Sequence, residues 1–357
     1  MSLHHVDWEA SSGVLAYLCV DAFLRDMVGA RALATAFETG LIDHLQEYGD
    51  VVWDDAIHNL GLDGRGSRLL LQMLRAHGVL DAGQDSGRIC LSGAFVEALR
   101  FRDILEAKLY FANLVAPDFT QLATALLMQP DVFFTHARLF KLFSYQYAET
   151  STPENREQTA RWMRITTALT HYEAAACLQA FDFSGYRNML DVGGNSGEFV
   201  LQICEAHPTL QASVIDLPVV CDIGMQHVAD HARGDAATRI RFVKHRREQP
   251  ALPRGHDLIS FKSMLHDWPE EPMVGFLQRA YDALPAGGTL MIFERCDSDI
   301  GAQQIGYGQL PLMMFFRSYR QPDVYAMHLA RIGFRDIEMA TVPLDIPFLL
   351  MTARKWE

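Results

Sequence analysis

The chain has 357 residues, 49% of them hydrophobic, which is enough for two folded units with separate cores. Its 31 basic and 44 acidic residues give a net charge of −13, which argues against nucleic acid or an anionic membrane as the main partner. The six cysteines form no CxxC pair, so neither a zinc site nor a redox dithiol is expected. We see no signal peptide and no apolar run of the ~20 residues that a membrane helix needs, so we expect a cytoplasmic protein.

The N-terminal part of the chain is predicted to be helical. Apolar residues recur at three- and four-residue spacing in residues 14–45 and again in residues 67–80. A turn-rich stretch and a short strand-like piece at residues 88–92 follow. Helices followed by a hairpin predict a winged helix over residues 1–105.

Winged helices can bind DNA, so the charge of this module must decide between DNA binding and packing. Residues 51–110 carry eight acidic and seven basic side chains. A DNA-binding face needs a net positive charge, because binding releases the counterions of the phosphates. The balanced charge favours a dimerisation module, and a regulator that binds DNA is the weaker alternative.

The C-terminal half alternates between strands and helices, which predicts an α/β class with a doubly wound, mostly parallel sheet. Seven strands are expected, at residues 188–194, 212–217, 239–244, 257–263, 288–295, 335–340 and 348–354. The link between the last two is too short for a helical crossover, so they should pair antiparallel. We assign residues 106–178 to a helical linker and substrate-pocket helices, and residues 179–357 to a catalytic domain.

The segment LDVGGNSGEF joins the first of these strands to a helix through a glycine-rich turn. Gly193, Gly194 and Gly197 permit close backbone approach and a positive φ, and the helix offers free N–H groups to a ligand. The third glycine comes too early for the GxGxxG of dinucleotide sites. Asp191 could accept a hydrogen bond from the ammonium of S-adenosylmethionine (SAM), whereas it would repel a pyrophosphate. A purely structural turn is the alternative.

Asp216 ends the second strand, where an acid can bind a ribose diol, and Leu217 follows it in the same site. Alone, Asp216 could simply cap a helix. The combination of a strand, a glycine loop and an acid at the end of the next strand favours a nucleoside-type cofactor.

The segment FKSMLHDWPEE follows the fourth strand. Lys262 and His266 lie at the carboxyl end of that strand, where open α/β sheets bind ligands. A neutral imidazole can take a proton from a hydroxyl near neutral pH. Glu294 ends the fifth strand, the expected neighbour, and could hold the ring in one tautomer. A lone histidine would more often cap a turn, but its position and Glu294 favour a general base.

Together these motifs resemble those of the dimeric, SAM-dependent small-molecule O-methyltransferases of plant phenolic and bacterial natural-product metabolism. The resemblance covers nearly the whole chain and is most specific in the histidine segment. It implies a Rossmann-like class I methyltransferase domain, a homodimer formed by the N-terminal helices, and SAM converted to S-adenosylhomocysteine without a metal. It also implies His266 as general base with Glu294 as its partner, Lys262 as a cofactor contact and Asp216 as the ribose ligand. Gly193 and the other loop glycines would line the methionine end.

Three positions depart from the family pattern. Asn195 replaces the middle glycine of the loop, which is mild because Asn tolerates a left-handed φ. Relatives usually have Gly-Asp, whose Asp accepts from the adenine amino group, where this chain has His245 and Arg246. Arginine can only donate, so Arg246 would contact the cofactor differently. Tyr319 stands where relatives often have a second Glu before the arginine, here Arg320.

The leading hypothesis is methyl transfer from SAM to a hydroxyl of an aromatic or polyketide-like small molecule. The departures leave open an alternative, a SAM-binding enzyme of the same fold that does not methylate, of the hydroxylase or pericyclase type. Met313 and Phe316, in the apolar run LPLMMFF, are the best candidates for the wall of the substrate pocket. Ordinary core packing explains such a run equally well.

Overall fold

The computed structural model describes residues 13–83, 85, 87–245, 251–296, 305–315 and 318–356. These residues form two compact units. The N-terminal unit contains residues 16–141 and a later segment, residues 305–313, and the catalytic unit contains the remaining described residues. The predicted linker is thus shared between the two units, and the predicted three-part division of the chain stays a prediction.

The N-terminal unit consists of helices and a small antiparallel sheet of order β1-β3-β2. The strands are β1 (Val51–Val52), β2 (Leu80–Ala82) and β3 (Arg88–Leu91). The helices are η2 (Ala16–Phe23), α1 (Met27–Glu38), α2 (Leu41–Tyr48), α3 (Trp53–Asn59), α4 (Gly64–Ala76), α5 (Gly93–Ala98), η3 (Leu99–Phe101), α6 (Arg102–Met128), α7 (Pro130–His136), α8 (Arg138–Leu142), η7 (Tyr307–Gln309) and α13 (Leu310–Met313). The hairpin β2–β3 follows the first four α-helices, as predicted.

The later segment completes the N-terminal unit through backbone and side-chain hydrogen bonds. The N–H of Gly308 donates to the carbonyl of Leu24 at 2.9 Å, and the N–H of Tyr307 donates to that of Arg25 at 3.1 Å. The phenol of Tyr307 also donates to Asn113 Oδ1 in α6 at 2.9 Å. Residues almost 300 positions apart in the sequence therefore belong to one folded unit.

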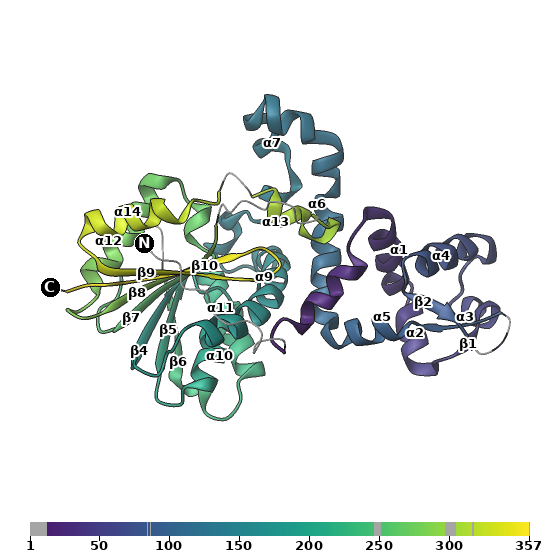
Figure 1. Ribbon diagram of the computed structural model, residues 1–357, viewed down its shortest axis with the longest axis horizontal. Helices are drawn as coiled ribbons and strands as arrows, with labels where there is room; N and C mark the ends of the chain where they lie inside the picture. The colour runs from purple at the N-terminus through teal and green to yellow at the C-terminus, as the bar shows by residue number, and fades with distance from the viewer. Residues whose placement is uncertain are drawn as a thin grey trace. The chain divides into compact units, whose positions relative to one another are not determined.

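The catalytic unit is built on a seven-stranded sheet of order β6-β5-β4-β7-β8-β10-β9, with helices on both faces (Figure 1). The strands are β4 (Asn188–Val192), β5 (Gln211–Asp216), β6 (Ile240–Lys244), β7 (Leu258–Lys262), β8 (Thr289–Arg295), β9 (Arg335–Val342) and β10 (Phe348–Arg354). The helices are η4 (Tyr145–Ala148), α9 (Pro153–Ala180), α10 (Glu198–Ala206), α11 (Pro218–His231), η5 (Ala236–Arg239), η6 (Leu265–Asp267), α12 (Glu270–Ala283) and α14 (Pro322–Ile332). All seven predicted strands are confirmed, and β10 pairs antiparallel with β8 and β9 while the other pairs are parallel.

The centre of the sheet is buried on both faces. Every residue of β7 and β8 is buried, which explains why these strands read as continuous apolar runs rather than alternating ones. The strand order reverses between β4 and β7, and such a reversal creates the crevice in which open α/β sheets bind ligands. Among the described helices, none is long and apolar enough to cross a membrane.

Candidate active site

The glycine loop after β4 has the backbone that its sequence predicts. Gly193 and Gly197 have φ values of 71° and 77°, and Asn195 takes the left-handed region at φ 55°. A Cβ at Gly193 would lie 2.5 Å from Cγ of Met264, and one at Gly194 would lie 2.6 Å from a carboxylate oxygen of Asp191. Only glycine permits this packing, which brings the loop against the turn that carries the predicted base.

Asp191 ends in a carboxylate that is buried within the sheet, with 1% of its surface exposed. Its Oδ1 accepts a hydrogen bond from the Ser260 hydroxyl at 2.5 Å, whereas its buried Oδ2 has no hydrogen-bond partner among the described residues. Burial raises the pKa of Asp191 to about 7, although the Ser260 bond and the nearby Lys262 oppose the rise. An orphaned carboxylate oxygen of this kind fits a cationic donor such as the ammonium of SAM.

A pocket lies beside the glycine loop. It brings together four of the predicted cofactor residues: Asp191, Gly193, Gly194 and Lys262. The other residues of its wall are Thr166, Leu169, Thr170 and Glu173 of α9, Asn195, Ser196, Phe199, Ser263 and Arg295. Helix α9 therefore supplies one wall of this pocket.

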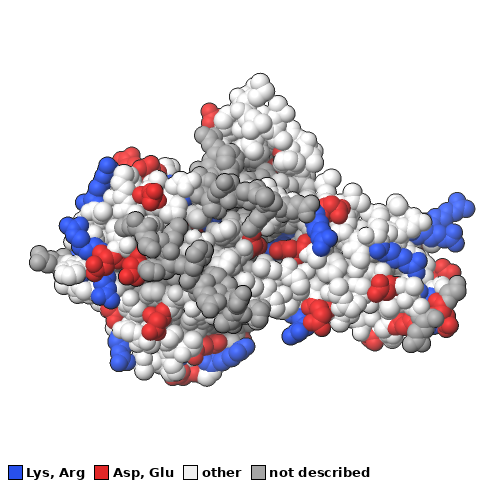
Figure 2. All heavy atoms as spheres, in the orientation of Figure 1, with Lys and Arg blue, Asp and Glu red and all other residues white. Residues whose placement is uncertain are grey.

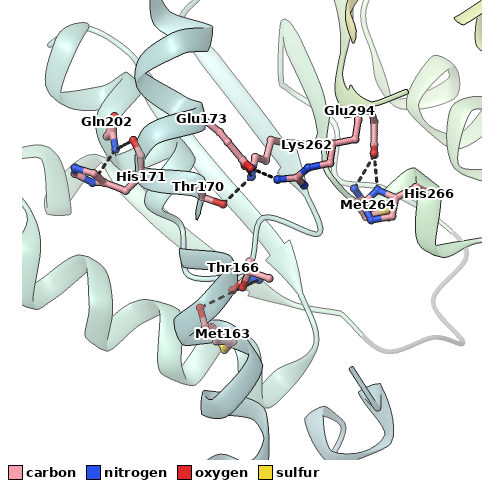
Figure 3. Close-up of polar contacts among 12 residues, drawn as sticks. Met163, Thr166, Thr170, His171, Glu173, Gln202, Lys262, Met264, His266 and Glu294 are labelled. Carbon is pink, nitrogen blue, oxygen red and sulfur yellow. Dashed lines mark hydrogen bonds and ion pairs between the residues drawn. The ribbon is translucent and has the colours of Figure 1, made fainter. Parts of the chain in front are cut away.

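Lys262 belongs to a buried ion cluster in this wall (Figure 3). Its ammonium donates to Thr170 Oγ1 at 2.7 Å and forms an ion pair with Glu173, which also pairs with Arg295. All four side chains are nearly buried, and buried charges persist only when they are paired. The bonds described here bring two cations and one anion to the wall, which also holds the carboxyl of Asp191.

Asp216 ends β5 next to the glycine loop. Its Oδ2 accepts from the N–H of Asn195 at 2.9 Å, and its Oδ1 accepts from the N–H of Leu217 at 2.7 Å. Burial raises the pKa of Asp216 to about 6, and these two hydrogen bonds limit the rise. Each carboxylate oxygen retains further acceptor capacity, so the side chain can still bind a diol. The predicted Leu217 takes part through its backbone and precedes α11.

His266 lies in η6, a single helical turn after β7. Its Nδ1 donates to Glu294 Oε2 at 2.6 Å, as Figure 3 shows. The other oxygen of Glu294 accepts from the N–H groups of Met264 and Leu265 at 2.6 and 2.7 Å. Glu294 is fully buried, so its carboxylate fixes both the imidazole ring and the backbone of the turn. The parallel pairing of β7 and β8 creates this contact, as the sequence predicted.

A second carboxylate, that of Asp267, lies on the other side of the imidazole. Its Oδ1 is 3.4 Å from His266 Nε2, and its Oδ2 accepts a hydrogen bond from the Tyr145 hydroxyl at 2.5 Å. Burial lowers the pKa of His266, but the charges of Glu294 and Asp267 and the hydrogen bond to Glu294 outweigh burial and leave that pKa above its ordinary value.

Aromatic rings surround His266 within the catalytic unit. The ring of Tyr319 is 5.7 Å from the imidazole, centroid to centroid, and the ring of Phe315 is 6.3 Å away. Phe143 packs edge-on against Phe315 at 5.7 Å and also contacts Trp162 at 6.1 Å. These rings offer apolar faces on which an aromatic substrate can stack.

Of the remaining predicted site residues, two fall outside the described residues and one belongs to the N-terminal unit. Arg246 and Phe316 lie outside the described residues. Met313 is the last residue of α13 in the N-terminal unit, where it is half-buried. Their roles stay predictions.

Several site residues were missed by the sequence analysis. Asp267 follows the predicted base directly, so its proximity could have been inferred. Tyr145 lies in an aromatic stretch before α9, and its bond to Asp267 joins residues 122 positions apart, which no local pattern indicates. Glu173 gave no signal, because its partner Lys262 is 89 residues away and its own helix shows an ordinary apolar pattern.

Comparisons with known proteins identify the family of this chain. The sequence profile of the O-methyltransferase domain family matches residues 119–335, more than half of the chain. The 3-hydroxy-5-methyl-1-naphthoate 3-O-methyltransferase of Streptomyces sahachiroi is 30% identical over 272 residues, which cover 74% of this chain and 73% of that protein. The L-tyrosine C(3)-methyltransferase of Streptomyces lavendulae is 25% identical over 275 residues, covering 75% of this chain and 72% of that protein.

The solved structures show the fold. The structure of human N-acetylserotonin methyltransferase in complex with SAM superposes with a TM-score of 0.72, at 20% identity and over 100% of both chains. The predicted fold class, a class I methyltransferase domain with a helical N-terminal domain, is therefore confirmed. The chain belongs to the O-methyltransferase family and is a SAM-dependent O-methyltransferase.

Proposed function

We propose that this enzyme methylates a hydroxyl of an aromatic, polyketide-like small molecule, with His266 as the general base. The observation that carries the proposal is the hydrogen bond from His266 Nδ1 to the buried carboxylate of Glu294. A neutral imidazole has one donor and one acceptor nitrogen, so this bond leaves Nε2 as the acceptor. Nε2 is therefore the atom that can remove a proton from a substrate.

The base acts by taking the proton of the substrate hydroxyl at Nε2, which leaves an oxygen nucleophile. SAM, when bound, supplies an electrophilic methyl group on a sulfonium. Glu294 stabilises the imidazolium that forms, because its carboxylate is already hydrogen-bonded to the ring. The remaining contribution of the protein is to hold the nucleophile in line for attack.

The residues beside the glycine loop fit the two polar ends of SAM. The orphaned oxygen of Asp191 can accept from the ammonium, and the cations of Lys262 and Arg295 in the same pocket can attract the carboxylate. Asp216 can accept from the ribose diol while it keeps its two backbone bonds. The contact of Arg246 with the adenine end stays a prediction.

An aromatic acceptor is favoured by the rings around His266 and by the relatives. The names of the two relatives above refer to a hydroxynaphthoate and to tyrosine, which both contain an aromatic ring. Those names also refer to oxygen and carbon as methylated atoms, so the hydroxyl of this substrate is inferred from the geometry of the base.

The test is a methylation assay with SAM and a panel of hydroxynaphthoates and simpler phenols, read by mass spectrometry. Replacing His266 by Ala should lower turnover by about 10²–10⁴-fold and leave SAM affinity roughly unchanged. His328→Ala is a matched control, since His328 also pairs with a carboxylate, that of Glu270, but on α14. It should leave turnover unchanged.

The assay also tests the non-methylating alternative. SAM binding without any methylated product, together with another conversion that survives His266→Ala, would replace the proposal by the hydroxylase or pericyclase type of function. Loss of SAM binding in His266→Ala would contradict the role of His266 as a base that acts only on the acceptor.

A further inference from the structure

The turn that carries His266 has little stability of its own. It is a 3-10 helix of three residues, Leu265–Asp267, and such turns have poor hydrogen-bond geometry. Its two backbone hydrogen bonds are long, 3.2 Å from Asp267 N to the carbonyl of Met264 and 3.3 Å from Trp268 N to that of Leu265. Groups outside the turn must therefore fix the direction of the imidazole.

Glu294 binds the backbone N–H groups at the start of the turn, and Arg320 binds the carbonyl of its first residue and the carbonyl just beyond its end. The guanidinium of Arg320 donates from Nη1 to the carbonyl of Leu265 at 3.1 Å and from Nη2 to the carbonyl of Trp268. These two carbonyls flank His266. A helical turn leaves N–H groups free at its start and carbonyls free at its end, which Glu294 and the bond from Arg320 to Trp268 satisfy. The carbonyl of Leu265 accepts from both Arg320 and the N–H of Trp268, so Arg320 also supports a hydrogen bond of the turn itself.

The residue before Arg320 contacts the imidazole itself. The ring of Tyr319 packs against His266 at 5.7 Å with an interplanar angle of 69°. Residues 319 and 320 therefore reach both the ring and the backbone of the turn. Arg320 itself is half-buried, which keeps its two bonds partly shielded from water.

We propose that Arg320 is a positioning residue for the catalytic histidine, acting through the two backbone carbonyls on either side of it. The inference rests on the proposed function of His266. The planar guanidinium holds the two carbonyls with two separate nitrogens, whereas lysine would have to bond both with one ammonium on a shorter reach, so we expect lysine to hold the turn less well.

Arg320 acts on His266 through the position of the turn and not through its charge. The groups that face His266 are Glu294 and Asp267, whose charges raise its pKa, Arg295, which lowers it, and the ring of Tyr319. If Arg320 holds the turn, its loss should loosen the His266–Glu294 hydrogen bond. The pKa of His266 should then fall toward the ordinary value, because Glu294 supports the imidazolium less well.

The experiment compares Arg320→Gln and Arg320→Lys with Arg331→Gln, an exposed arginine at the end of α14. Both substitutions of Arg320 should lower kcat by roughly 10–100-fold, the cost of a misplaced catalytic group, with SAM affinity roughly unchanged. The acidic limb of the kcat profile, measured at saturating SAM, should move to lower pH. The control should match the parent enzyme.

NMR titration of the His266 ring in the cofactor-free protein separates this inference from the proposed function, because it needs no methyl acceptor. A lowered pKa of His266 in both variants supports the positioning role even if no acceptor is methylated. An unchanged pKa and an unchanged kcat in Arg320→Lys would overturn it. If Arg320→Gln does not fold, Arg320→Lys, which keeps the charge and the aliphatic stem, decides alone.

Discussion

Asp191 shows how a single side chain can link cofactor binding to pH. One oxygen of its carboxylate is bonded to Ser260, and the other is buried without a partner among the described residues. With a pKa of about 7, the carboxyl is partly protonated at neutral pH. A cationic ligand binds only the ionised form well, so binding must displace the proton.

We therefore expect SAM to bind about tenfold more weakly at pH 6 than at pH 8, because each pH unit below the pKa costs one factor of ten. Calorimetric titration at both pH values measures the affinity and the protons released. Asp191→Asn should bind about tenfold to a hundredfold more weakly at pH 8 and lose the pH dependence.

Asp230→Asn, at an exposed position on α11, is the control and should bind SAM as the parent does. An Asp191→Asn variant with undiminished affinity, or one that keeps the pH dependence, would exclude Asp191 as the ligand of the ammonium.

At the scale of elements, one carboxylate joins three helices behind the glycine loop. Glu198, the first residue of α10, has its side chain only 7% exposed and pairs with His171 of α9 and His227 of α11, both at 2.7 Å. Gln202, one turn along, donates to the same carboxylate at 2.8 Å. Burial alone would raise the pKa of Glu198, but these hydrogen bonds outweigh it and lower that pKa to about 2.

Replacing Glu198 by Gln should lower the unfolding temperature of the catalytic unit by several degrees. The lost charged hydrogen bonds are worth roughly 1–3 kcal/mol, and about 1 kcal/mol moves a unit of this size by roughly 2–4 °C. The folded pKa lies below the unfolded value of about 4.3, so the stabilisation is present above pH ~4.3 and is lost as pH falls toward 2. Scanning calorimetry should show the difference at pH 7 and a smaller one below pH 4.

Glu338→Gln, at an exposed position on β9, should leave the unfolding temperature unchanged. Equal unfolding temperatures for Glu198→Gln and the parent at pH 7 would contradict the role of this junction.

Most of the helices and strands could be predicted from the sequence. Strands β7 and β8 are continuous apolar runs, so their existence and their pairing could be predicted, and the His266–Glu294 contact followed from that pairing. What could not be read are contacts between side chains far apart in the chain. The bond from Arg320 to the catalytic turn spans 52–55 residues, and the residue type alone equally predicted a solvated surface charge.

At the scale of the whole molecule, the acidic balance of the chain agrees with a small-molecule enzyme. In the face that Figure 2 shows, Lys and Arg side chains alternate with Asp and Glu side chains over the N-terminal unit, on the right. A face of mixed sign does not attract phosphates strongly. The absence of DNA binding by this unit stays a prediction.

A homodimer formed by the N-terminal helices stays a prediction, and exposed apolar side chains on this unit support it. On α1, the side chains of Met27 and Val28 are 46% and 59% exposed. Two adjacent exposed apolar side chains offer a surface that a second copy of the chain could cover. Light scattering should give the mass of a dimer for the parent. Val28→Asp should shift the protein toward monomer, because a charge at a packed apolar contact is costly.

The control is Met225→Asp on α11, where an apolar side chain is exposed to a similar extent, 44%, in the catalytic unit. It should remain dimeric. A monomeric parent would refute the dimer, and an unaffected dimer in Val28→Asp would remove α1 from its interface.

The late segment of the N-terminal unit has a consequence for protein synthesis. Leu24, Arg25 and Asn113 leave the ribosome long before Tyr307 and Gly308, which bond to them. N-terminal domains usually fold first as the nascent chain emerges. Here the N-terminal unit remains incomplete until most of the strands of the catalytic sheet have been translated. The N-terminal unit of this enzyme therefore reaches its final form only late in translation.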